Sequence, residues 1–86
     1  MVEHELKTRA EAFDAIVNGL KTFEVRKNDR FFQSGDIVIL KCMDRDTPYW
    51  YDSSKKPLRF RIGWMLQGGQ FGIEPGYCVF QLEPLP

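Results

Sequence analysis

The arrangement of this chain depends on one stretch, Gly19-Leu20-Lys21-Thr22-Phe23-Glu24-Val25-Arg26-Lys27-Asn28-Asp29-Arg30. A helical pattern stops at Gly19, and a strand is predicted over residues 22–27. Because successive side chains of a strand point to opposite faces, Glu24 and Arg26 share one face. Phe23 and Val25 share the other, and we expect that apolar face to hold the strand to the core.

The residues before this stretch predict a short strand followed by the main helix. Val2 to Lys7 alternates weakly, which would place His4 and Leu6 on an inward face. Apolar residues then recur at helical spacing and predict a helix over about residues 9–19, at Phe13, Ile16, Val17 and Leu20. Thr8-Arg9-Ala10-Glu11 has the form of a capping box at its start.

The residues after the stretch predict further strands joined by turns. Residues 37–43 are apolar on both faces and should form a central strand. Residues 58–62 alternate, with Leu58, Phe60 and Ile62 inward. The glycine-rich residues 67–76 predict a tight loop close to the strand of Glu24, and a last strand covers residues 77–82. The aromatic run 49–51 suits either base stacking or packing, and the sequence leaves both open.

These elements indicate a mixed α/β, mainly β, fold of about six short strands and one helix. We expect a small β-barrel that closes on itself, with the helix packed on it, in a single domain over residues 1–86. The formal net charge of zero argues against a sequence-blind duplex binder, which is usually basic.

Composition also bounds the chemistry and the compartment. Cys42 and Cys78 lie in apolar runs and are expected to be buried, reduced thiols. One histidine and no close cysteine pair predict no metal, and no motif predicts a cofactor. The charged first residues do not suit a signal peptide, and no apolar run has membrane-spanning length. We therefore expect a cytoplasmic protein.

The motif Gly19-x-Lys21-x-x-Glu24-x-Arg26 resembles the signature of the ASCH domain superfamily, whose fold is similar to the PUA domain. Further matches look like the DUF3850 branch of that superfamily. They are His4-x-Leu6-Lys7, Lys21 through Arg30, Gly35-Asp36, and Gly68-Gly69-x-Phe71-Gly72-Ile73-x-x-Gly76-Tyr77. The resemblance covers the chain apart from residues 44–61, and it implies a PUA-like closed barrel with a groove between the helix and the next strand.

In this superfamily the groove is proposed to bind RNA or a nucleotide-like ligand. On that expectation, the ligand-binding candidates are Lys7, Lys21, Glu24, Arg26, Lys27, Asn28 and Arg30. Lysine and arginine would engage phosphate or a base edge, and Glu24 and Asn28 would read base donors and acceptors. The neutral net charge suits a single-stranded segment or one nucleotide better than a duplex.

Two other hypotheses stand beside binding. Another ASCH branch hydrolyses N4-acetylcytidine, with a lysine at the position of Lys21 and a threonine where this chain has Glu24. A small amidohydrolase would use Lys21 or Glu24 as its catalytic group. Alternatively, Glu24 and Arg26 form a structural ion pair in a structural or protein-interaction module. The sequence leaves open whether the protein is an enzyme, and it assigns no role to Glu74.

Overall fold

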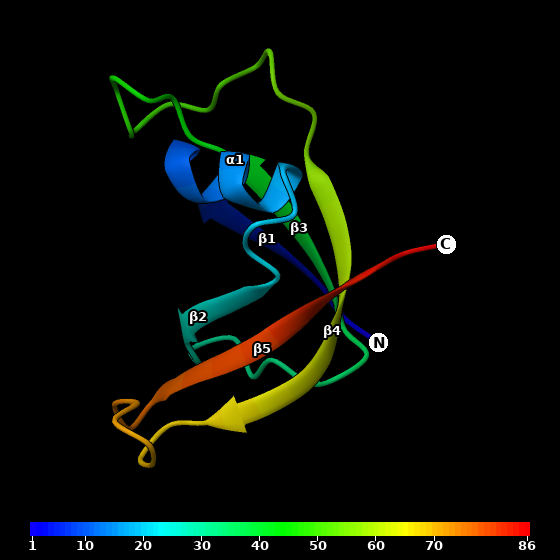
Figure 1. Cartoon of the computed structure of the whole chain (residues 1–86), viewed down its shortest axis with the longest axis vertical. Coiled ribbons are helices and arrows are strands. Elements are labelled where there is room, and N and C mark those ends of the chain that lie inside the picture. Colours follow the sequence, from blue (N-terminus) through cyan, green and yellow to red (C-terminus); the bar gives the residue numbers. More distant parts are fainter.

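A computed structural model describes all 86 residues as one five-stranded sheet with a single α-helix at one end (Figure 1). The helix crosses the sheet above β1 and β3, while β2, β4 and β5 extend away from it. In chain order the elements are β1 Glu3–Thr8, α1 Ala10–Val17, β2 Phe23–Lys27, β3 Ile37–Cys42, β4 Leu58–Gln67 and β5 Tyr77–Pro84.

The sheet has the order β1-β3-β4-β5-β2, so the first two strands of the chain form its two edges. β1 pairs with β3 in parallel, and α1 lies in the connection between the two strands. All other pairs are antiparallel. A bulge between Ile62 and Met65 interrupts the pairing of β4 with β5. Bulges bend strands, and this long strand belongs to a sheet that curls into a half-barrel.

The core lies inside the curl, and it confirms most of the predicted inward positions. β3 lies between β1 and β4 and carries Val38 and Leu40, which are fully buried. Ile62 is buried while Arg59 and Arg61 are exposed, as the alternation of β4 predicted. His4 and Leu6 of β1 are buried, although Val2 is exposed. Cys42 and Cys78 are buried free thiols, as expected.

The helix α1 is shorter than predicted and begins differently. Phe13 and Ile16 face the core, whereas Val17 is exposed in the last turn. The predicted capping box does not form, because Thr8 still belongs to β1 and the N-cap, Arg9, makes no side-chain capping bond. Gly19 has φ of 74°, the left-handed conformation predicted for the residue after the helix. The chain has no helix of the length and apolarity that crossing a membrane demands.

The prediction of a closed barrel with about six strands is wrong. The structure has five strands, and β1 and β2 remain unpaired edges that face each other across a seam. Residues 49–51 add no sixth strand and contribute only the single bridge of Met43 with Tyr51. Side chains span the seam instead: Arg26 Nη2 donates to Lys7 O over 3.0 Å, and Arg30 Nη1 donates to Glu5 O over 2.5 Å.

The predicted orientation of β2 is also wrong. Glu24 faces the inside of the half-barrel and is only 3% exposed, whereas Phe23 and Val25 face outward at 44% and 52%. On the outer face Val25 lies opposite Val79 of β5, so it keeps one apolar neighbour. Two ion pairs satisfy Glu24 on the inside. The interior near the start of α1 is therefore polar, and it forms the site described next.

Candidate functional site

The centre of the candidate site is the carboxylate of Glu24, held between two cations. Arg26 Nε donates to Glu24 Oε2 over 2.6 Å. Lys21 Nζ donates to Glu24 Oε1 and also to Phe23 O, over 2.7 Å for the latter. Burying a carboxylate is costly unless cations and hydrogen bonds compensate, and here each carboxylate oxygen has a charged partner. The three side chains form a fixed unit that we call the Glu24 triad.

Local sequence explains how the Glu24 triad is positioned. Gly19 turns the chain sharply after α1, and the amides of Leu20 and Lys21 both donate to Ala15 O. This turn places Lys21 beside the first residues of β2, with Nζ 5.2 Å from the centre of the Phe23 ring. Arg26 then reaches from β2 to the edge of β1, where Nη2 also lies 3.5 Å from Thr8 Oγ1.

A pocket of about 310 Å³ opens beside the Glu24 triad, between the end of β1, the start of α1 and β2. The residues that give it its chemistry are Lys7, Thr8, Arg9, Lys21, Glu24 and Arg26. Lys21 and Arg26 are engaged by Glu24, but Lys7 and Arg9 are exposed and make no ion pair or side-chain hydrogen bond. The pocket therefore combines a fixed carboxylate with a surplus of free positive charge.

The structure separates the predicted ligand-binding residues into two groups. Lys7, Lys21, Glu24 and Arg26 meet at the pocket. The other predicted residues, Lys27, Asn28 and Arg30, do not line it.

Lys27 lies on the outward face of β2 with Phe23 and Val25, because the alternation of the strand turns it away from Glu24. Arg30 lies at the seam, where its Nη1 donates a hydrogen bond to Glu5 O.

Asn28 has a structural position at the far end of β2. Its backbone N–H donates to Gly76 O over 2.8 Å. Its side-chain Nδ2 donates to Gln67 Oε1, and its Oδ1 accepts from the backbone N–H of Phe32. Asn28 thus joins the loop after β2 to the glycine-rich loop between β4 and β5. That loop lies close to β2, as predicted, but beside Asn28 and outside the pocket. The loop requires glycine at its first residue after β4, since a Cβ at Gly68 would lie 2.0 Å from Glu74 O.

Sequence reasoning missed Arg9 and Thr8 as pocket residues. Both were assigned to the predicted capping box, where their side chains would serve the helix. The weak alternation of β1 continues through Lys7 and Thr8, and that continuation was the available signal for a longer strand. Once β1 reaches Thr8, the next residue lies at the corner between strand and helix, which brings Arg9 to the pocket.

The second buried carboxylate, Asp36, lies away from the pocket, near the start of β1 and β3. His4 Nε2 is 2.9 Å from Asp36 Oδ2, and the His4 ring packs edge-on against Phe32. Burial alone would raise the pKa of Asp36, but hydrogen bonds from His4 and from the N–H groups of Val2 and Gln33 outweigh burial and lower it. Burial also raises the pKa of Cys42 and of Cys78, so neither thiol is set up as a nucleophile.

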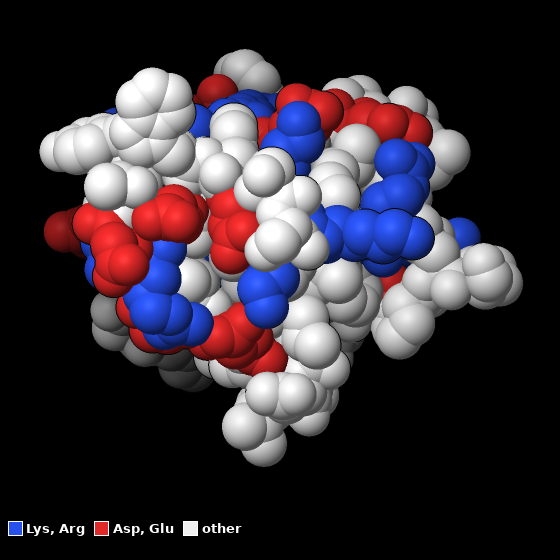
Figure 2. Space-filling model, turned by 90° about the horizontal axis from the view of Figure 1, so that it is seen from above, with Lys and Arg blue, Asp and Glu red and all other residues white.

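Surface charge is mixed at the end of the molecule that carries α1. Figure 2 shows acidic and basic side chains interspersed on this face, without a continuous basic track. No three His, Cys, Asp or Glu side chains gather where they could hold a metal ion. The chemistry that the pocket offers is therefore electrostatic: Lys7 and Arg9 are available as cationic donors for an anion, while both oxygens of Glu24 are engaged by Lys21 and Arg26.

Two comparisons relate the chain to known sequences. A protein of Escherichia phage P2, described as an uncharacterized 12.9 kDa protein in the GpA 3′ region, is 46% identical over 37 residues. These residues are 43% of this chain and 34% of the phage protein, so the match spans about a third of that relative's length. The family model described as a domain of unknown function, DUF3850, matches residues 3–82. Because that match covers the helix, the whole Glu24 triad and all of the strands except the last two residues of β5, the chain belongs to the DUF3850 family.

Proposed function

We propose that this domain is a PUA-like relative of the ASCH domains that binds RNA or a nucleotide-like ligand in the cytoplasm, at the pocket beside the Glu24 triad. One observation carries the proposal. A fully satisfied, buried carboxylate lies next to two unpaired cations, Lys7 and Arg9, at a pocket of about 310 Å³. Free cations beside a pocket suit a phosphate group, while the carboxylate, whose two oxygens are engaged by Lys21 and Arg26, holds those two side chains in place.

The positions of the two kinds of group support a division of roles. Lys7 and Arg9 have no partner within the chain, so an anion can bind them without breaking an existing contact. Arg26 is different, since its guanidinium already joins Glu24 to the backbone of Lys7. We assign Lys7 and Arg9 to phosphate binding, and Arg26 to positioning Glu24 and holding the seam.

The amidohydrolase alternative is less well supported by the same contacts. A lysine that acts as a base or nucleophile needs a free lone pair on Nζ. Lys21 Nζ instead donates to both Phe23 O and Glu24, so its orientation is set by these two acceptors of the chain itself. Binding therefore explains the arrangement better than acyl transfer through Lys21. The contacts of Arg26 with Glu24 and with Lys7 O also fit the third hypothesis, a structural or protein-interaction module, but that hypothesis leaves the free cations Lys7 and Arg9 without a role.

An NMR titration of backbone amides tests the proposal. We expect short single-stranded RNA to shift resonances of residues 7–12 and 21–26. Lys7→Ala should weaken RNA binding several-fold and lower the slope of log affinity against log salt by about one, because one phosphate contact is lost. Lys27→Ala is the matched control, since Lys27 is also exposed but does not line the pocket.

Three results would contradict the proposal or redirect it. Absence of any shift with RNA and with mononucleotides would remove the binding function. Equal losses in Lys7→Ala and Lys27→Ala would show that charge, rather than the pocket, drives association. Release of acetate from N4-acetylcytidine, lost in Lys21→Ala, would establish the hydrolase alternative.

A further inference from the structure

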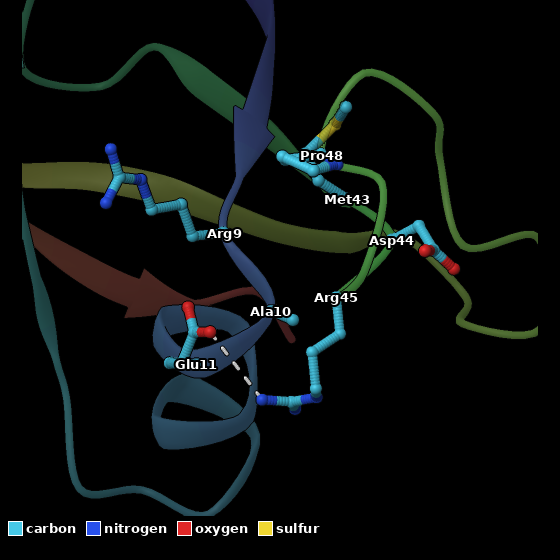
Figure 3. A pocket seen from close by; sticks show the side chains of 7 residues that line it. All are labelled: Arg9, Ala10, Glu11, Met43, Asp44, Arg45 and Pro48. Atoms are coloured by element: carbon cyan, nitrogen blue, oxygen red, sulfur yellow. Dashed lines mark ion pairs between the residues drawn. The ribbon is translucent and has the colours of Figure 1, made fainter.

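A second pocket, of about 330 Å³, adjoins the first one and shares Arg9 with it. Figure 3 shows Arg9 on one side of this pocket, and Pro48 and Arg45 on the other side. The guanidinium of Arg9 is directed away from both of these residues. Arg45 is already paired with Asp14 at 2.6 Å and with Glu11 at 3.7 Å. This second pocket is thus charge-balanced, unlike the cationic pocket on the far side of Arg9, and suits a neutral group better than a phosphate.

The rim of the second pocket is a loop held rigidly by Asp44. Asp44 Oδ2 accepts hydrogen bonds from the N–H of Asp46 over 3.1 Å and from the N–H of Thr47 over 2.9 Å. Asp44 N donates in turn to Trp50 O over 2.7 Å, which ties the end of the turn back to its start. The loop conformation is therefore fixed by internal contacts before any ligand arrives.

The same loop presents two aromatic side chains that the fold does not use. Tyr49 and Trp50 directly follow Pro48 at the rim, and they are 91% and 70% exposed. Aromatic side chains normally bury large areas in a small domain, so neither residue contributes its usual share of stability. Exposed aromatic rings close to a cationic site are the arrangement by which proteins hold single-stranded nucleic acid, with bases stacked and phosphates neutralised. Here the rings follow the rim of the second pocket, and the cationic pocket adjoins it through Arg9.

We propose that the binding site extends from the Glu24 triad across Arg9 to Tyr49 and Trp50, and that its ligand is a single-stranded nucleic acid of more than one nucleotide. This inference rests on the proposed function of the first pocket and adds the ligand class to it. One phosphate lies at Lys7 and Arg9, the chain crosses Arg9, and the next base enters the second pocket and stacks on Trp50.

The two tryptophans provide a matched experiment. Trp50 and Trp64 are almost equally exposed, at 70% and 68%. Trp50 lies in the loop whose residues 43–45 and 48 line the second pocket, whereas Trp64 lies on β4, which contributes no residue to either pocket. Affinities are measured for uridine monophosphate and for a short oligonucleotide, supplied as RNA and as DNA. Trp50→Ala should weaken oligonucleotide binding on the order of ten-fold, through the lost stacking, and leave mononucleotide binding unchanged. Trp64→Ala should change neither affinity, and both variants should keep the parent melting temperature.

The outcomes separate this inference from the proposed function. Mononucleotide binding with no effect of Trp50→Ala on the oligonucleotide would overturn the extended site and leave the first pocket as the whole site. Equal affinity of the parent protein for mononucleotide and oligonucleotide would overturn it too. Failure of both probes to bind would overturn the extended site together with the proposed function. Quenching of Trp50 fluorescence in a Trp64→Phe background, with oligonucleotide only, would support the stacking directly.

Discussion

Two buried carboxylates, Glu24 and Asp36, have opposite surroundings in this small domain. Asp36 is 5% exposed and accepts from two backbone N–H groups and from a buried imidazole, so its partners are fixed parts of the fold. Glu24 is 3% exposed, but its partners are the long side chains of Lys21 and Arg26 at the edge of a pocket. Burial of a carboxylate therefore does not identify a site. The partial exposure of its partners and the adjoining free cations do.

The largest expected effect is that of Asp36→Ala. The variant leaves the partly buried N–H groups of Val2 and Gln33 and the buried ring of His4 without their acceptor. With about 1–3 kcal/mol for the buried ring and about 1 kcal/mol for each partly buried N–H group, we expect a loss of roughly 4 kcal/mol of unfolding free energy. Urea denaturation measures this loss, and any fraction that remains folded should bind nucleotide as the parent does. A loss below that of Glu24→Ala would contradict the comparison.

Glu24→Ala should lower the unfolding free energy less than Asp36→Ala does, and it should impair nucleotide binding more. Removing one partner of a fully buried ion pair typically costs about 3–5 kcal/mol, but Lys21 and Arg26 are partly exposed and can turn to solvent. We therefore expect a loss of about 2 kcal/mol, measured in the same urea series. Without the carboxylate the two cations lose their fixed positions, and the affinity for nucleotide should change. Unaltered affinity would show that the triad only stabilises β2.

The smallest of these effects is expected in the unfolding free energy at acidic pH. The pKa of Asp36 is below its ordinary value of 3.8, so the unfolded chain binds more protons than the folded one in this range. The stability that Asp36 contributes is complete above the unfolded pKa and is lost as pH falls through the lower folded pKa. Unfolding free energies between about pH 5 and pH 2 should therefore converge for the parent and Asp36→Ala.

Other carboxylates also make the unfolding free energy depend on pH, but they do so equally in the parent and in Asp36→Ala. Local hydrogen bonds with Thr47 and with Ser54 also lower the pKa of Asp44 and of Asp52, and both proteins retain those contacts. The difference between the two curves thus isolates Asp36. Parallel curves over the whole range would contradict the role given to its hydrogen bonds.

Prediction from sequence succeeded where local signals govern the structure. The spacing of Phe13 and Ile16 located α1, Gly19 marked the turn after it, and the alternation of Leu58 through Ile62 assigned the faces of β4. Four of the seven predicted binding residues, Lys7, Lys21, Glu24 and Arg26, line the pocket of the candidate site. Lys21, Glu24 and Arg26 lie close in sequence and meet at the pocket. Arg9 was missed because its position depends on where β1 ends.

The sequence by itself determined the types of the elements, their order and the residues that share each strand face, because these follow from side-chain periodicity and turn chemistry within a few residues. Only the tertiary structure decided which face of β2 lies inside and whether the sheet closes. Strand periodicity has no direction: it groups Glu24 with Arg26 but does not say which side meets the core. That choice came from contacts between distant segments, namely the hydrogen bonds that Arg26 and Arg30 make across the seam to the backbone of β1.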